Sequence, residues 1–198
     1  MIPLNVAMAL AEAGRRMDGR GWVPGSSGNL SARLDERQIA ITRSGVHKGK
    51  LKVEDDIIAV DYQGIPAVEG QKPSAETLLH CQLYRLIPSV GAVLHGHSVA
   101  ATVLSRLGPI IFSGYELLKA FGFTTHDVEV NFPIYENNQD IPGLVKQIEP
   151  NLRTEPSIGY AITGHGLYAW GTNVEHALWR LEALEFLLAC ELQRRQMK

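Results

Sequence analysis

Hydrophobic residues recur at spacings that predict a helix near each end of the chain. Between Val6 and Met17 they return every three or four positions, which is typical of an amphipathic helix. The same spacing predicts a longer helix from Val174 to Arg195, with Asn173 at the position of its N-cap. The leucines of this last helix form a broad apolar face, which indicates burial or a contact between subunits.

The middle of the chain alternates between shorter helical and extended segments. Ser74 is a favourable N-cap for a helix over 75–87, and Ser98 is one for a helix that runs to Leu107. Further helical segments are predicted over 115–121 and 144–149.

Apolar runs bounded by turn residues predict the strands. They cover residues 30–33, 38–42, 57–61, 65–68, 90–95, 110–112, 127–135, 158–162 and 167–170. The third and fourth runs should form a hairpin around Gln63 and Gly64, and the last two runs should form another. Because short turns join several neighbours, we expect an α/β fold of three layers, a mostly antiparallel central sheet with helices on both faces, built as a single domain over residues 1–198.

Composition and charge narrow the functional classes. The 198 residues are 45% hydrophobic and 20% charged, and the formal net charge of -2 arises from basic and acidic residues mixed along the chain. This balance predicts neither a nucleic-acid footprint nor a basic membrane patch, so an anionic partner should be small. Cys81 and Cys190 lie in apolar, helix-like segments, and no apolar stretch is long enough to span a membrane. We therefore expect a cytoplasmic protein with free thiols.

Three histidines form the strongest chemical signal of the sequence. His95 and His97 are two positions apart at the end of an apolar run, so strand alternation directs both rings to the same side. His165 lies between Gly164 and Gly166, and glycine lets a backbone approach an ion closely. Three neutral histidines leave a divalent metal one open position, which is how a catalytic zinc site that polarises a substrate oxygen is built.

Three turns rich in serine and glycine offer hydroxyls and backbone N–H groups to an anion. They lie at 26–29, 42–45 and 72–74, and the last precedes a predicted helix whose N-terminus favours negative charge. The candidate phosphate-binding residues are Ser27, Gly28, Asn29, Ser44, Gly45 and Ser74. Because the chain carries neither a P-loop nor the glycine fingerprint of dinucleotide-binding folds, the turns suit a phosphate group but not a nucleotide.

Two glutamates, Glu76 and Glu116, are candidates for proton transfer. Glu76 falls in the first turn of the helix predicted after Ser74, and Glu116 lies in the segment from Gly114 to Lys119. Acidic residues near helix N-termini are usually solvated. The spacing alone assigns the proton transfer to neither residue.

These motifs together resemble the class II (zinc) aldolase/epimerase family, in the order in which that family carries them. The resemblance rests on Ser27-Gly28-Asn29, Thr42-Arg43-Ser44-Gly45, Lys72-Pro73-Ser74-Ala75-Glu76, His95-Gly96-His97-Ser98 and Gly164-His165-Gly166. Within the family, the segments around Glu116, over 133–137 and over 165–171 are similar to those of the methylthioribulose-1-phosphate dehydratases of methionine salvage.

The resemblance implies an activity and residue roles. One Zn²⁺ per subunit would be held by His95, His97 and His165, and the serine and glycine turns would bind the substrate phosphate. Glu116 would be the acid/base of dehydration, with Glu76 a possible second acid/base. The implied substrate is a phosphorylated ketose, 5-methylthioribulose 1-phosphate, which would lose water to give 5-methylthio-2,3-diketopentyl 1-phosphate. The family also implies a homo-oligomer, a tetramer.

Two other functions stay open at this point. A class II sugar-phosphate aldolase or epimerase, of the fuculose or ribulose phosphate type, would start from the same carbonyl, and in an aldolase Glu76 would carry more of the proton transfer. A non-catalytic zinc-binding regulator would need the histidines but would not need three anion-binding turns.

Overall fold

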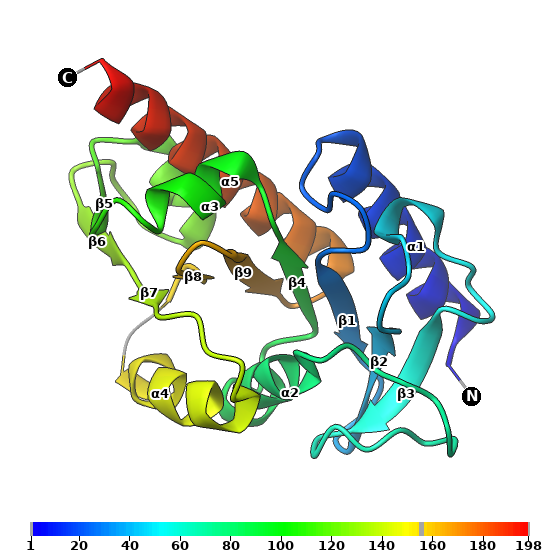
Figure 1. The fold of residues 1–198 in the computed structure, drawn as a ribbon. Helices are drawn as coiled ribbons and strands as arrows, with labels where there is room; N and C mark the ends of the chain where they lie inside the picture. Colours follow the sequence, from blue (N-terminus) through cyan, green and yellow to red (C-terminus); the bar gives the residue numbers. More distant parts are fainter. Residues whose placement is uncertain (1, 155–156, 198) are drawn as a thin grey trace.

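A seven-stranded sheet forms the centre of the protein (Figure 1). The computed structural model describes residues 2–154 and 157–197. In spatial order the strands are β3 (Ile57–Asp61), β2 (Gln38–Thr42), β1 (Asn29–Arg33), β4 (Ala92–Gly96), β9 (Gly166–Gly171), β8 (Tyr160–Ile162) and β7 (Ile134–Tyr135). All neighbours pair antiparallel except β7 and β8, which are parallel. The predicted, mostly antiparallel central sheet is confirmed.

Helices cover both faces of this sheet, as the sequence predicts. One face carries α1 (Leu4–Gly19), α3 (Val99–Leu104) and α5 (Val174–Gln196), and the other carries α2 (Thr77–Leu86) and α4 (Ile141–Thr154). Successive residues of β4 join different cores, because strand side chains alternate. Leu94 packs in the core beneath α1 and α5, whereas Val93 packs in the core beneath α2 and α4. Each face of the sheet therefore has its own hydrophobic core, and the fold has three layers.

The remaining elements lie outside the large sheet. β5 (Ile110–Ser113) and β6 (Glu129–Phe132) form a two-stranded antiparallel sheet, and the 3-10 helix η2 (Glu116–Phe121) lies between them in the chain. A second 3-10 helix, η1 (Lys48–Lys50), packs on α1. No helix within the described ranges is long and apolar enough to cross a membrane.

The expected hairpin around Gly64 forms only in part. β3 forms as predicted, but residues 65–68 are not a strand and return beside β3 through an isolated bridge between Val60 and Pro66. Pro66 has no N–H to donate to a ladder, which explains why regular pairing does not continue there. The prediction of a strand over 65–68 is wrong.

α2 begins two residues later than predicted, and Ser74 is not its N-cap. The helix starts at Thr77, whose backbone N–H donates to the Ser74 carbonyl at 3.1 Å and whose hydroxyl donates to the same oxygen at 2.6 Å. The Ser74 hydroxyl accepts a longer hydrogen bond, 3.4 Å, from the backbone N–H of Glu76. Residues 74–76 therefore form a turn ahead of the helix. Glu76 lies directly before the first helical residue, and the Glu76 side chain reaches β1.

Two other helix boundaries differ from the prediction. α3 ends at Leu104 rather than at Leu107, and α4 extends well beyond 144–149. The apolar spacing of α4 explains its length, because Leu144, Ile148 and Leu152 all pack in the core beneath α2 and α4.

Two predicted N-caps are confirmed. The Ser98 hydroxyl accepts a hydrogen bond from the backbone N–H of Ala101 at 3.1 Å, and Asn173 Oδ1 accepts one from the backbone N–H of His176 at 2.8 Å. Each cap satisfies one of the N–H groups that the first helical turn leaves without an intrahelical partner.

Removing the cap of the last helix should destabilise the fold. We expect Asn173→Ala to lower the free energy of unfolding by about 1 kcal/mol, since a freed N–H loses its partner. Urea denaturation measures the change. Gln63→Ala, in an exposed turn, is the control and should leave the midpoint unchanged. An equal midpoint for Asn173→Ala and the control would contradict a stabilising cap.

Candidate active site

His95 is held in one orientation by β9, the strand beside β4. Its ring stacks on Tyr168 of β9, with ring centres 4.1 Å apart, and the side chain is fully buried. Its Nδ1 lies 2.9 Å from the carbonyl oxygen of Leu167, which can only accept a hydrogen bond. Nδ1 therefore carries the proton, and Nε2 keeps a free lone pair. A carbonyl oxygen that accepts from one ring nitrogen of a histidine in this way orients the other nitrogen for metal binding.

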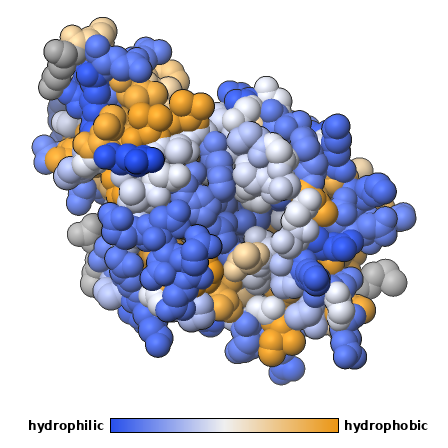
Figure 2. All heavy atoms as spheres, viewed as in Figure 1, coloured by the Kyte–Doolittle hydropathy of each residue, from blue (hydrophilic) through white to orange (hydrophobic). Residues whose placement is uncertain are grey.

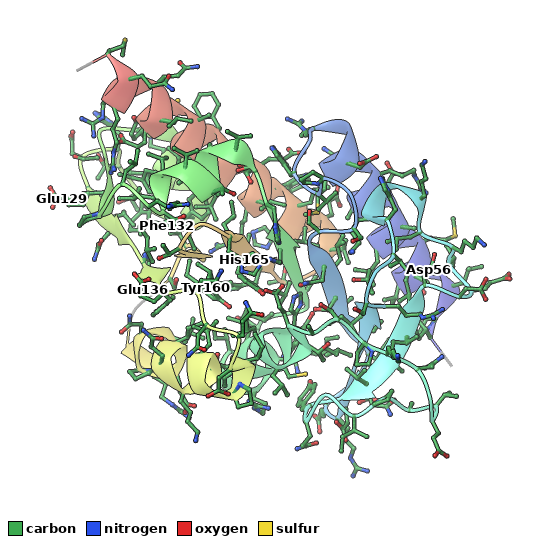
Figure 3. The ribbon with its side chains drawn as sticks, in the orientation of Figure 1. Asp56, Glu129, Phe132, Glu136, Tyr160 and His165 are labelled. Atoms are coloured by element: carbon green, nitrogen blue, oxygen red, sulfur yellow. The ribbon has the colours of Figure 1, made fainter. Side chains whose placement is uncertain are left out.

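The fold brings the three predicted histidines together. His97 follows the end of β4, and His165 lies in the turn between β8 and β9, in the middle of the molecule (Figure 3). The two Nε2 atoms of His95 and His97 are 2.8 Å apart, and the His97 and His165 ring centres are 4.5 Å apart. One ligand atom from each of the three residues lies within 4.8 Å of the others.

These rings are suited to hold a cation. Burial, with the neighbouring histidines, lowers the pKa of His97 to about 3, so its ring is neutral and offers a lone pair. Burial likewise lowers the pKa of His95. The buried Nδ1 of His165 has no hydrogen-bond partner among the described residues. Three imidazoles that converge on one point are the donor set of a zinc site with an open position.

Glu76 lies directly beside the histidines. Its two carboxylate oxygens are 3.2 Å from His95 Nε2 and 3.2 Å from His165 Nε2. Burial would raise the pKa of this carboxyl, but His95, His165 and the Asn29 amide favour its charged form and lower the pKa to about 2. Glu76 is therefore a carboxylate at neutral pH, the form that accepts a proton or faces a cation.

The three turns rich in serine and glycine line a cavity beside the histidines. This cavity of about 390 Å³ is bounded by His97, His165 and Glu76. All six candidate phosphate-binding residues line it: Ser27, Gly28, Asn29, Ser44, Gly45 and Ser74. Gly28 and Gly45 have φ values of +70° and +77°, a backbone conformation that other residues rarely adopt. The buried hydroxyl oxygen of Ser27 has no hydrogen-bond partner among the described residues, so it is free to bind a ligand.

The structure adds cavity residues that the sequence analysis left without a role. Lys48 is 2% exposed, and its Nζ donates to the carbonyl oxygens of Ser26 at 2.6 Å and Val46 at 2.7 Å. Burial lowers its pKa to about 8, although Glu76 acts in the opposite direction. Further polar residues that line the cavity are Arg43, Asn137, Asn138 and Gln139. The sequence pattern that could have indicated Asn137, Asn138 and Gln139 is the polar run that they form shortly after β7.

Within one chain, Glu116 does not join this site. Its side chain is 71% exposed and contacts Lys119 Nζ at 2.5 Å and His126 Nδ1 at 3.5 Å. It lines a separate, apolar hollow with Trp179 and Phe186 of α5. None of its recorded contacts involves the three histidines or the residues of their cavity.

Comparisons with known proteins show the family to which the chain belongs. The family model for the class II aldolase and adducin N-terminal domain matches residues 8–192. The methylthioribulose-1-phosphate dehydratase of Acidiphilium cryptum is 55% identical over 97% of this chain and 92% of its own length. The dehydratase of the same name from Granulibacter bethesdensis is 54% identical over 99% and 95%.

The fold has solved counterparts as well. An L-fuculose 1-phosphate aldolase superposes with a TM-score of 0.83 at 21% identity, over 100% of this chain and 89% of that one. This likeness supports the fold that the sequence predicts. Since the family model spans most of the chain and relatives more than half identical cover nearly all of it, the protein belongs to the family of the class II aldolase and adducin N-terminal domain.

Proposed function

We propose that this protein is a methylthioribulose-1-phosphate dehydratase, which removes water from 5-methylthioribulose 1-phosphate to form 5-methylthio-2,3-diketopentyl 1-phosphate in methionine salvage. The observation that carries the proposal is the name shared by relatives that are more than half identical along nearly the whole chain. The cavity supports it, because a metal-binding cluster, a carboxylate and a phosphate-sized set of donors lie together. Free thiols at Cys81 and Cys190 are consistent with a cytoplasmic enzyme.

His95, His97 and His165 would hold one Zn²⁺ per subunit. Bound there, zinc supplies Lewis-acid polarisation of the C2 carbonyl, which makes the neighbouring C3–H bond more acidic. The turn residues bind the phosphate through hydroxyls and backbone N–H groups. The buried ammonium of Lys48 adds positive charge behind two of those turns.

Glu76 is the carboxylate placed to take the C3 proton. It lies beside the histidines and is ionised, so a carboxylate oxygen accepts the proton as the enediolate forms. The C4 hydroxyl then leaves as water, for which a second group must donate a proton. The enol that results tautomerises to the 2,3-diketone.

We assign that donation to Glu116 from a neighbouring copy of the chain. Lys119 lowers the pKa of Glu116 in the single chain, where its carboxylate is solvated. Contact with another subunit would remove water from this carboxyl and raise its pKa, as a proton donor needs. The surface around it suits such a contact, because Trp179 is 55% and Phe186 57% exposed. Figure 2 shows apolar surface gathered over α3 and α5. We propose a homotetramer, as the family implies.

The zinc site predicts a loss of metal on substitution. Replacing His95, His97 and His165 together with Ala should abolish stoichiometric zinc in elemental analysis of the purified protein, since no ligand of the cluster remains. Replacement of His47 and His176 by Ala is the matched control and should leave one zinc per subunit. Full retention of zinc by the triple variant would place the metal elsewhere.

Product analysis separates the proposed dehydratase from an aldolase. The proximity of Glu76 to the histidines also suits an aldolase, which would break the C3–C4 bond. Incubated with 5-methylthioribulose 1-phosphate, the protein should yield a product lighter by one water in mass spectrometry. A plain ketose phosphate should yield no cleavage fragments. Cleavage of either compound would favour the aldolase, and no turnover of either would favour a non-catalytic protein.

The role of Glu116 predicts both a loss and a rescue. Glu116→Gln should fold, keep zinc and lose dehydration by about 10²- to 10⁴-fold, since glutamine cannot donate the proton. Mixed oligomers of Glu116→Gln with His95→Ala, each inactive alone, should regain turnover, because one site then combines intact groups from two chains. Near-wild-type dehydration by Glu116→Gln would show that another residue donates the proton. Absence of rescue would show that the site does not combine residues from two chains.

A further inference from the structure

A row of buried polar side chains joins α2 to β1. Glu76, His80 and Tyr84 are spaced four residues apart, at the start of α2 and along it, and Asn29 and Ser31 are spaced two apart on β1. Four helical residues rise about 6 Å, and two strand residues rise about 6.6 Å. The two rows therefore stay in step, and their side chains interleave.

Hydrogen bonds link the five residues into one chain, here called the α2–β1 hydrogen-bond chain. Asn29 Nδ2 donates to Glu76 Oε2 at 2.8 Å, and Asn29 Oδ1 is bonded to His80 Nε2. Ser31 Oγ is 2.7 Å from His80 Nδ1 and 2.8 Å from the Tyr84 hydroxyl. His80 and Ser31 are both fully buried, so no bulk water replaces these partners.

The partners fix the direction of every bond. The Glu76 carboxylate only accepts, so Asn29 must turn its NH₂ to Glu76 and its carbonyl oxygen to His80. His80 must then carry its proton on Nε2, which leaves Nδ1 as an acceptor for the Ser31 hydroxyl. The Ser31 oxygen in turn accepts from Tyr84. All four bonds donate toward Glu76, and aligned bonds of this kind strengthen one another.

The packing of α2 against the sheet does not require polar side chains at the positions of the α2–β1 hydrogen-bond chain. The other residues of the core between α2, α4 and the sheet are mostly apolar, among them Leu79, Leu83 and Val93. A buried polar group is costly unless every partner is present, and apolar side chains would fill the same space without that cost. The chain ends on Glu76, whose carboxylate faces the histidines, while its Tyr84 end is buried.

We infer that His80 and Ser31 are positioning residues for catalysis: through Asn29 they hold the Glu76 carboxylate in line with the three histidines and keep the Asn29 NH₂ turned toward it. The catalytic part of this inference rests on the proposed function. The arrangement of the bonds does not, so the two are tested separately. Burial lowers the pKa of His80 to about 3, which agrees with a ring that stays neutral.

The tautomer of His80 tests the bond directions without any substrate. Long-range nitrogen–proton NMR of the uniformly ¹⁵N-labelled protein should show the His80 proton on Nε2 and a lone pair on Nδ1. Ser31→Ala, a small change, removes the donor to Nδ1 while Asn29 Oδ1 still accepts from Nε2–H, so the Nδ1 resonance should shift and the proton should stay on Nε2. His176→Gln, at the surface, is the control and should leave the His80 signals unchanged. A His80 proton on Nδ1 in the unsubstituted protein would overturn the chain.

Kinetics test the positioning role. His80→Phe keeps a flat ring but removes the donor to Asn29, and it should lower kcat for dehydration about 10- to 100-fold, with KM little changed and one zinc retained, because a misplaced catalytic group costs about this much. His80→Gln restores an N–H donor and should recover most of kcat. A purely structural role predicts lower thermal stability with an unchanged kcat per zinc-loaded site, and that result would overturn the inference.

Two measurements keep the inference testable if His80→Phe does not fold. The tautomer of His80 is read on the unsubstituted protein, and Ser31→Ala, which removes one of the two hydrogen bonds of the His80 ring, should lower kcat. An unchanged kcat for Ser31→Ala, in protein whose Nδ1 resonance has shifted, would refute the positioning role. If the protein dehydrates no substrate while His80 keeps its proton on Nε2, the proposed function fails and the hydrogen-bond chain stands.

Discussion

The site depends on the close approach of β9 to β4. A side chain at Gly166 would place its Cβ 2.1 Å from the carbonyl oxygen of Gly96, so only glycine allows the two strands to lie this close. The approach has two consequences for the histidines. It brings the turn that carries His165 next to His95, and it puts the Leu167 carbonyl where it fixes the tautomer of His95. Metal-binding geometry thus arises from backbone pairing.

The second requirement of the site is a carboxylate buried beside those rings. An ionised carboxylate loses the hydration of water when it is buried, so it needs compensating partners. Asn29 supplies a hydrogen bond, and a cation between the rings and the carboxylate would supply the charge. The hydrogen-bond chain behind Asn29 shows that the protein orders this carboxylate from the core rather than from the solvent side. The solvent side stays open for a ligand.

The outer surface has a separate role. Glu116 and the exposed aromatic residues of α5 lie in a hollow of their own, away from the histidine cavity. A catalytic group on such a surface works only if another molecule brings it to a site. Oligomerisation would then be part of the active site's assembly as well as of its stability. The leucine face of the last helix is buried in the core of the single chain, so such a contact would use the exposed Trp179 and Phe186 instead.

Much of this protein follows from local sequence. Strand alternation was enough to place His95 and His97 on one side, and glycine around His165 was enough to indicate a close approach. The caps of α3 and α5 followed from Ser98 and Asn173, because a cap involves residues three positions apart. The mostly antiparallel sheet at the centre of the three-layer fold followed from the short turns between apolar runs.

Tertiary structure decided the rest, because it depends on residues distant in the sequence. Spacing could not choose between Glu76 and Glu116, and only the packing of α2 on β1 puts Glu76 at 3.2 Å from two histidines. The same packing puts His80 of α2 at the centre of a buried hydrogen-bond network. Only the fold buries Lys48 behind the anion-binding turns, where it is 2% exposed. Contacts between segments tens of residues apart set these roles, and no local pattern encodes them.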